Sequence, residues 1–147
     1  MIRYLQQPAY SVIGREGSTN DGAGFIQSLW NDANAHYGEV ASLAAQPLTL
    51  WGAMSALDGS LMPWEEEFSK GKYLAGIQAL PDAQPPAGWV KWDFPAYEAI
   101  VLPMTETAFA EGLALLKAQH LSLALAVQER TDPAAGETVL VFPIKLL

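Results

Sequence analysis

The chain has 147 residues, of which half are apolar, and its 5 Trp, 5 Tyr and 5 Phe are enough for one domain with a sizeable core. Sixteen acidic residues against eight basic ones give a net charge of −8, which disfavours direct nucleic-acid binding. The absence of cysteine excludes disulfides, thiolate metal sites and thiol catalysis. Neither a membrane-spanning run nor a signal peptide is evident, so we expect a single cytoplasmic domain over residues 1–147.

The first half of the chain predicts one helix among three strands. A strand is expected over residues 10–16, followed by a turn-rich segment. Phe25, Leu29 and Ala33 then recur every fourth residue, which is typical of an amphipathic helix. Two further strands are expected over residues 48–56 and 72–80.

A proline-rich stretch over residues 81–88 cannot form regular structure and is interpreted as a connection between two halves. The second half repeats the order of the first, with a strand over 89–102 interrupted at Pro95, a helix capped by Thr105, and strands over 121–130 and 138–146. The pattern therefore predicts an α+β fold of two β-α-β-β repeats, over approximately residues 1–80 and 89–147. Two such units can pair their sheets and leave a groove between them.

Glu129 is the strongest candidate for a functional side chain. In a strand, Leu125, Val127 and Glu129 share one face, so the carboxylate continues an apolar row. A buried carboxylate is costly unless it is paired, and it would either hold a cation or take a raised pKa suited to proton transfer. The alternative is that the strand ends here and Glu129 lies in solvent beside the turn.

Aromatic residues in the predicted strands form the second feature, because cations bind well over aromatic faces. The candidates are Trp51, Tyr73, Trp92, Tyr97 and Phe142. Core packing is the alternative for each of them. Trp30 and Phe109 lie on helical stripes and are expected in the core. His36 and His120 show no metal-ligand spacing, and Gly22 and Gly24 lack a dinucleotide fingerprint, so neither a metal nor a cofactor is expected.

Several separated segments resemble the GyrI-like family, also described as the AraC-type effector-binding or multidrug-binding domain, and in particular its stand-alone bacterial subgroup. They lie at residues 24–34, 50–55, 73–77, 89–92 and 95–98. The resemblance covers nearly the whole chain. It implies two β-α-β-β units about a pseudo-twofold axis, with antiparallel sheets forming a central ligand cleft and helices on the outer side.

The resemblance also implies a site. Relatives fused to DNA-binding domains sense lipophilic cations through a buried glutamate ringed by aromatic residues, on the strand before the last hairpin. Its counterpart here is Glu129. The ring would then come from the aromatic residues named above, with Trp92 and Tyr97 ahead of Trp51, Tyr73 and Phe142.

Three functions are compatible with the resemblance. The first is a stand-alone protein that holds a hydrophobic, cationic small molecule for sensing or resistance. With no helix-turn-helix segment expected beside the domain, it would not bind an operator itself. The second is a hydrolase of cyclopropane-bearing genotoxic compounds, in which Glu129 orients or deprotonates water. The third is a gyrase-inhibitor-like protein interaction. Whether the protein is an enzyme, and whether it takes a protein partner or forms a homodimer, is left open.

Overall fold

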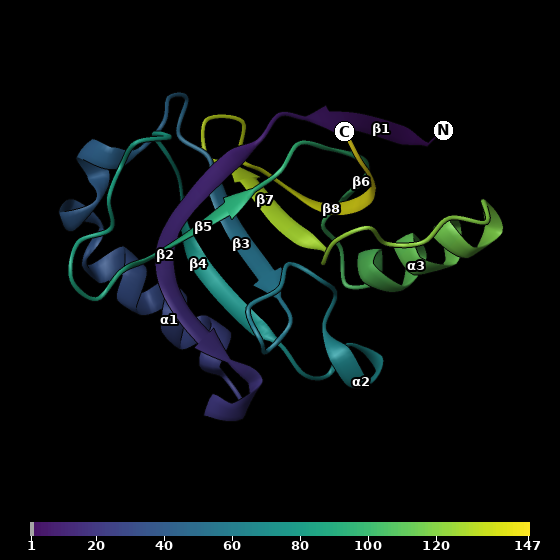
Figure 1. The fold of residues 1–147 in the computed structure, drawn as a ribbon, viewed down its shortest axis with the longest axis horizontal. Helices are drawn as coiled ribbons and strands as arrows, with labels where there is room; N and C mark the ends of the chain where they lie inside the picture. Colours follow the sequence, from purple (N-terminus) through teal and green to yellow (C-terminus); the bar gives the residue numbers. More distant parts are fainter. Residues whose placement is uncertain (1) are drawn as a thin grey trace.

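The structure is a computed structural model that describes residues 2–147. Within these residues the chain forms eight strands and three α-helices (Figure 1): β1 (Arg3–Gln7), β2 (Tyr10–Ser18), α1 (Phe25–Ala35), β3 (Leu50–Ser55), α2 (Glu65–Phe68), β4 (Lys72–Ala79), β5 (Val90–Phe94), β6 (Tyr97–Pro103), α3 (Ala108–Ala118), β7 (Gln128–Asp132) and β8 (Glu137–Leu146). Across the same residues, no helix is long and apolar enough to cross a membrane.

All strands join one antiparallel sheet in the order β1-β6-β8-β7-β3-β4-β2-β5. The sheet curls like part of a barrel (Figure 1). The expected α+β class and the two β-α-β-β repeats are confirmed: β2-α1-β3-β4 forms one half of the sheet and β6-α3-β7-β8 forms the other. The halves join where β3 pairs with β7 at the centre.

The outermost strand of each half comes from the opposite half. β1 pairs with β6, and β5 pairs with β2. The same tripeptide, Pro-Ala-Tyr, makes both crossings, at residues 8–10 and 95–97. Gln7 lies opposite Tyr97, and Phe94 lies opposite Tyr10, so the two crossings are related by a twofold operation.

The strand pairings carry this twofold relation to the centre of the sheet. Tyr10 and Tyr97 are 87 residues apart, so Gly14 corresponds to Val101. In the first half, Gly14 lies opposite Gly76, which in turn lies opposite Trp51. In the second half, Val101 lies opposite Val141, which in turn lies opposite Gln128. Gly76 therefore corresponds to Val141, and Trp51 corresponds to Gln128. The next residues along β3 and β7 are therefore counterparts as well. These are Gly52 and Glu129, which also lie directly opposite each other.

The inside of the curl is filled by side chains. Tyr10 and Tyr97 lie on strands separated by four others, yet their hydroxyls form a hydrogen bond of 2.7 Å. Trp51 stacks on Tyr10 with ring centroids 4.3 Å apart, and Phe94 stacks on Tyr10 at 4.8 Å. The helices cover the other, outer face, as expected: α1 contacts β2 and β4, whereas α3 contacts β6 and β8.

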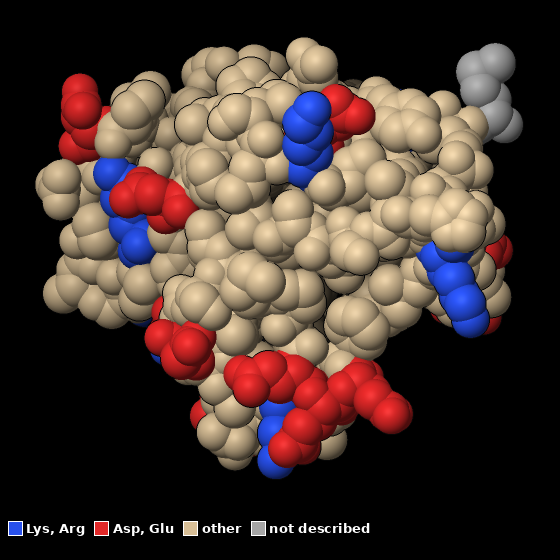
Figure 2. Space-filling view, turned by 45° about the vertical axis from the view of Figure 1, so that its right-hand side comes forward, with Lys and Arg blue, Asp and Glu red and all other residues tan. Residues whose placement is uncertain are grey.

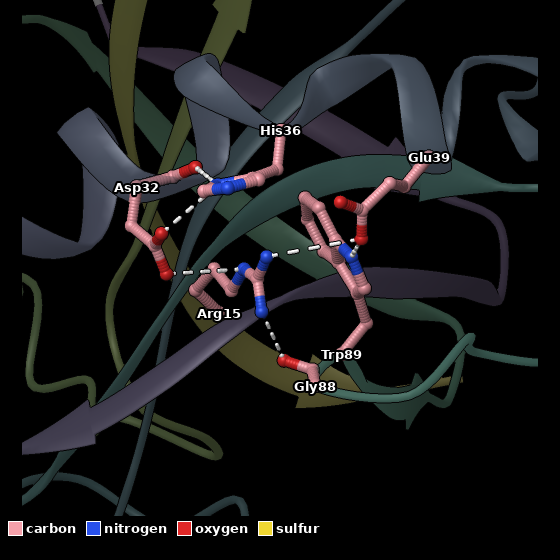
Figure 3. A network of polar contacts seen from close by, with 6 residues as sticks. All are labelled: Arg15, Asp32, His36, Glu39, Gly88 and Trp89. Carbon is pink, nitrogen blue, oxygen red and sulfur yellow. Dashed lines mark hydrogen bonds and ion pairs between the residues drawn. The ribbon is translucent and has the colours of Figure 1, made fainter.

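A polar network holds α1 against the sheet (Figure 3). The Arg15 guanidinium, on β2, lies 3.2 Å from an Asp32 carboxylate oxygen on α1 and donates to the Gly88 carbonyl at 2.7 Å. The same guanidinium lies 4.3 Å from the ring centroid of Trp89, whose indole N–H donates to Glu39. Arg15 thus connects α1 to the segment that leads into β5.

Two sequence predictions were wrong in detail, and one strand, β1, was not predicted. The strand expected over residues 121–130 begins only at Gln128, and residues 121–127 run as irregular chain. The buried side-chain amide of Gln128 takes the place of strand-to-strand hydrogen bonds here. It accepts from the Met54 N–H and donates to the Met54 and Ala126 carbonyls. α3 begins at Ala108, with Thr107 rather than Thr105 at its N-cap.

The short α2 segment is left-handed over three residues. Glu66, Glu67 and Phe68 have φ values of 49°, 58° and 65°. Non-glycine residues adopt this conformation at a cost of roughly 1–2 kcal/mol each. The segment is closed at its base by backbone hydrogen bonds in both directions between Glu65 and Lys70. This turn is thereby fixed beside the outer face of the sheet.

The Tyr10–Tyr97 hydrogen bond gives a stability prediction. Replacing either tyrosine by phenylalanine leaves a buried hydroxyl unpaired, which costs about 1–3 kcal/mol. The double variant Tyr10→Phe/Tyr97→Phe leaves no such group and should lose less stability than the sum of the single variants. Urea unfolding of the four proteins measures the coupling. Strictly additive losses would contradict a direct hydroxyl–hydroxyl contact.

Candidate functional site

A cavity of about 330 Å³ lies on the helix-bearing face of the sheet. The central strands β3 and β7 form its floor, because α1 and α3 pack mainly over the strands on either side. Most of its lining is apolar, and it comes from both long helices, the α2 segment and the central strands: Ile26, Met54, Pro63, Trp64, Phe68, Met104, Thr105, Glu106, Phe109, Ala126, Val127, Glu129 and Leu140.

Glu129 is the carboxylate on the floor of this cavity. It projects from β7 on the same face as Leu140 of β8, which lies opposite it in the sheet. The Tyr73 hydroxyl, on β4, donates a hydrogen bond of 2.6 Å to Glu129 Oε1. β3 runs between β4 and β7, so this hydrogen bond crosses over the central strand.

Gly52 makes that crossing sterically feasible. It lies opposite Glu129 in the sheet. A Cβ atom at this position would lie 2.7 Å from Glu129 Oε1 and even closer to the Tyr73 hydroxyl. Any side chain here would occupy the space in which the two groups meet. Glycine at position 52 is therefore a requirement of the site.

A second hydrogen bond connects this pair to α1. The indole N–H of Trp30 donates to the Tyr73 hydroxyl at 2.9 Å, and the two rings meet edge to face with centroids 6.5 Å apart. The ring of Tyr73 is buried with only 1% of its surface exposed. Helix α1 thus reaches the Glu129 carboxylate through Tyr73.

Burial controls the acid–base behaviour of the pair. Desolvation raises the pKa of Glu129 above its ordinary value, and the hydrogen bond from Tyr73 opposes part of that rise. Desolvation and the neighbouring carboxylate together raise the pKa of Tyr73, so its hydroxyl keeps its proton. The arrangement can hold a cation against an ionised carboxylate, or accept a proton from a bound molecule.

The aromatic residues expected around Glu129 occupy three different places. Tyr73 contacts the carboxylate directly. Trp51 and Tyr97 are fully buried in the cluster inside the curl, and Trp92 packs against that cluster, so these three lie on the face opposite the cavity. Phe142 is buried beneath α3, where its ring packs close to Gly112.

Three other aromatic residues line the cavity. Phe109 comes from α3, and Trp64 and Phe68 come from the α2 segment. Trp64 packs onto Gly71 and donates its indole N–H to the Lys72 carbonyl at 3.0 Å. Phe68 meets Phe109 edge to face with ring centroids 5.1 Å apart. The two sides of the cavity therefore touch at this pair.

The sequence carried a partial signal for these aromatic residues. Phe109 was expected in the core because it lies on the buried stripe of its helix. Trp64 directly precedes α2 and Phe68 ends it, and this short left-handed segment has no helical periodicity that would assign a side chain to a face. Within residues 2–147, no group of three or more histidine or acidic side chains is arranged to hold a metal ion.

No protein-family model and no curated protein matches the chain. Several solved structures share its fold. The Vibrio cholerae integron cassette protein VCH_CASS2 has a TM-score of 0.58 at 12% identity, covering 99% of this chain and 95% of that one. The EcmrR C-terminal domain has a TM-score of 0.62 at 10% identity, covering 100% and 98%.

A third similar structure is that of SAV2435 bound to tetraphenylphosphonium. Its TM-score is 0.58 at 11% identity, covering 99% of this chain and 94% of that one. The chain has the fold expected from the resemblance to the GyrI-like effector-binding domain. At these identities the likeness concerns the fold.

The space above Gly52 gives a second prediction. Gly52→Ala inserts a methyl group between Tyr73 and Glu129, and overpacking of this kind costs about 1–3 kcal/mol. Thermal or urea unfolding measures the loss. Gly38→Ala is the matched control, because a Cβ at Gly38 meets no atom within 4 Å. Equal stabilities of the two alanine variants would contradict the close packing at Gly52.

The raised pKa of Glu129 gives a third prediction. Between the unfolded pKa of a glutamate, about 4.3, and the raised folded pKa, the folded protein binds more protons than the unfolded chain. The contribution of Glu129 to stability is therefore complete at low pH and is lost as the pH rises. Glu129→Gln, whose carbonyl still accepts from Tyr73, should be more stable than the native protein at neutral pH.

Unfolding free energies measured from acidic to neutral pH test this sign. The stability difference between Glu129→Gln and the native protein should grow as the pH rises, by about 1.4 kcal/mol for each unit by which folding raises the pKa. A difference that shrinks with rising pH would show that the folded state favours the ionised carboxylate.

Proposed function

We propose that the protein binds a hydrophobic, cationic small molecule in the cavity above β3 and β7, with Glu129 as the counter-charge. The observation that carries the proposal is the position of this carboxylate: it lies half-buried on the floor of a mainly apolar cavity. An ionised carboxylate in such surroundings is costly by itself, and a bound cation removes that cost.

Aromatic rings support a cationic ligand. Trp64, Phe68 and Phe109 line the walls, and a cation over an aromatic face gains roughly 0.5–2 kcal/mol. Trp51, Trp92 and Tyr97 remain expectations from the resemblance, and they belong to the cluster inside the curl, on the other face of the sheet. We therefore place the ring of the proposed site in the three wall residues, with Tyr73 beside the carboxylate.

The charge around the cavity has the sign that a cation needs. Glu106 lines the cavity, and the three exposed glutamates at 65–67 belong to the segment that contributes Trp64 and Phe68. In Figure 2, acidic side chains gather at the lower end of the molecule, the end at which Figure 1 draws α2. This local field raises the concentration of cations near the opening.

SAV2435, which shares the fold, was solved with a lipophilic cation, tetraphenylphosphonium. We infer the same broad class of ligand for this protein and a use in sensing or resistance, in which a bound compound is registered or withheld. The hydrolase and the gyrase-inhibitor-like roles stay predictions from the resemblance. Product formation by Glu129 with a cyclopropane-bearing compound, followed by mass spectrometry, would establish the hydrolase.

Calorimetry with small aromatic cations tests the binding function. The native protein should bind naphthylmethylammonium, and Glu129→Gln should bind it at least about tenfold more weakly, since the charge interaction in the half-buried site is lost. Glu137→Gln makes the same change of charge at an exposed position on β8 and should leave the affinity unchanged. Equal losses in both variants would reduce the effect to net charge and contradict a role for Glu129 in the site.

A further inference from the structure

The hydrogen bonds that end at Glu129 have a fixed direction. The indole nitrogen of Trp30 can only donate, so the Tyr73 hydroxyl must accept from it. The single proton of that hydroxyl is then directed to Glu129 Oε1, 2.6 Å away. The hydrogen bond from Trp30 thus determines the direction of the one between Tyr73 and Glu129, in which Oε1 must accept.

The packing around the chain of hydrogen bonds maintains this direction. Tyr73 is buried, its ring meets Trp30 edge to face, and its hydroxyl occupies the space beside Gly52, so the ring is packed on both sides. Within residues 2–147, Tyr73 is the one hydrogen-bond donor to the Glu129 carboxylate. The second carboxylate oxygen, Oε2, is therefore an acceptor without a protein donor, on a side chain that lines the cavity.

A ligand that fills the cavity must supply a hydrogen-bond donor to Oε2 or leave this oxygen without one. It expels the water that would otherwise satisfy this oxygen. Most of the lining side chains, Met54, Val127 and Phe109 among them, carry no N–H or O–H group. The two hydrogen-bond donors in the lining have other partners: Trp64 donates to the Lys72 carbonyl, and the Thr105 hydroxyl lies 3.4 Å from that of Thr107. A fully substituted ammonium or phosphonium ion supplies charge but no donor. A protonated amine or an amidinium supplies both, and the resulting hydrogen bond is charge-assisted.

From this geometry we propose that the cavity selects cations that donate an N–H group over fully substituted cations with the same aromatic body. In this arrangement Trp30 and Tyr73 are positioning residues that determine which partner Glu129 accepts. The inference rests on the proposed function and adds to it the class of cation and the residues behind the choice.

The direction of the hydrogen bonds predicts that Glu129→Gln changes which ligands the cavity prefers. Because Tyr73 must donate, the new amide has to place its carbonyl on Tyr73 and its NH₂ group toward the cavity. The variant therefore presents a donor where the native protein presents an acceptor. It should reject an ammonium ion and gain affinity for a neutral molecule that carries a carbonyl group.

Trp30→Phe separates this positioning effect from a general one. Trp30 does not line the cavity, and phenylalanine cannot donate to Tyr73. In Trp30→Phe/Glu129→Gln the Tyr73 hydroxyl is free to accept from the amide, which can then turn its carbonyl toward the cavity. The ketone preference of Glu129→Gln should fall by at least about threefold in the double variant, because the amide then samples both orientations.

Three probes with one naphthalene body test the proposal by calorimetry at neutral pH: naphthylmethylammonium, naphthylmethyltrimethylammonium and methyl naphthyl ketone. The native protein should bind the ammonium ion at least about tenfold more tightly than the trimethylammonium ion, which is the scale of one charge-assisted hydrogen bond. Glu129→Gln should bind the ketone more tightly than the native protein does. The comparison of the two cations uses the native protein alone and does not depend on how the variants fold.

The outcomes distinguish donor selectivity from cation binding itself. Equal affinity for both cations, or tighter binding of the trimethylammonium ion, would overturn the donor selectivity while leaving cation binding in place. The same ketone gain with and without Trp30 would overturn its positioning role. If the native protein binds none of the three probes, the proposed function itself fails, and the inference fails with it.

Discussion

The site depends on one hydrogen bond that passes over the central strand of the sheet. Adjacent strands lie about 4.8 Å apart, so side chains on β4 and β7 must bridge roughly twice that distance. Tyr73 is long enough to do so, and Gly52 leaves the path open. This single contact positions the carboxylate on the cavity floor and connects the floor to α1 through Trp30. It also adds to the rise in the pKa of Tyr73 that burial causes.

The two faces of the sheet differ in what covers them. The inside of the curl is packed with aromatic rings, and there Tyr10 of one half meets Tyr97 of the other through a hydrogen bond of 2.7 Å. On the outer face, α1 packs mainly over β2 and β4, and α3 packs mainly over β6 and β8. The cavity lies between them, above β3 and β7, and the turn containing Trp64 and Phe68 forms part of its wall. The aromatic cluster and the cavity thus lie on opposite faces of one sheet.

Much of the fold could be predicted, because helix and strand periodicity is strong in both halves. The strand predicted over residues 121–130 was wrong for residues 121–127. Its alternating leucines do not share one face of a sheet, because Leu125 is buried inside the curl and Leu123 packs under α3. Glu129 could be singled out by its place after an apolar row. Which face each aromatic residue takes could not, since a strand pattern separates two faces without saying which of them carries the cavity.

The twofold relation between Gly52 and Glu129 has a consequence for how such a site can arise. Two identical half-length chains, assembled as a homodimer, would have to place the same residue at both positions beside the axis. Two glycines would leave no charge, and two glutamates would repel each other and fill the gap that Tyr73 needs. Joining the halves in one polypeptide lets the two copies diverge, so that one gives up its side chain and the other keeps an acid. The asymmetry of the cavity floor is therefore a property that a symmetric pair of identical half-length chains could not have.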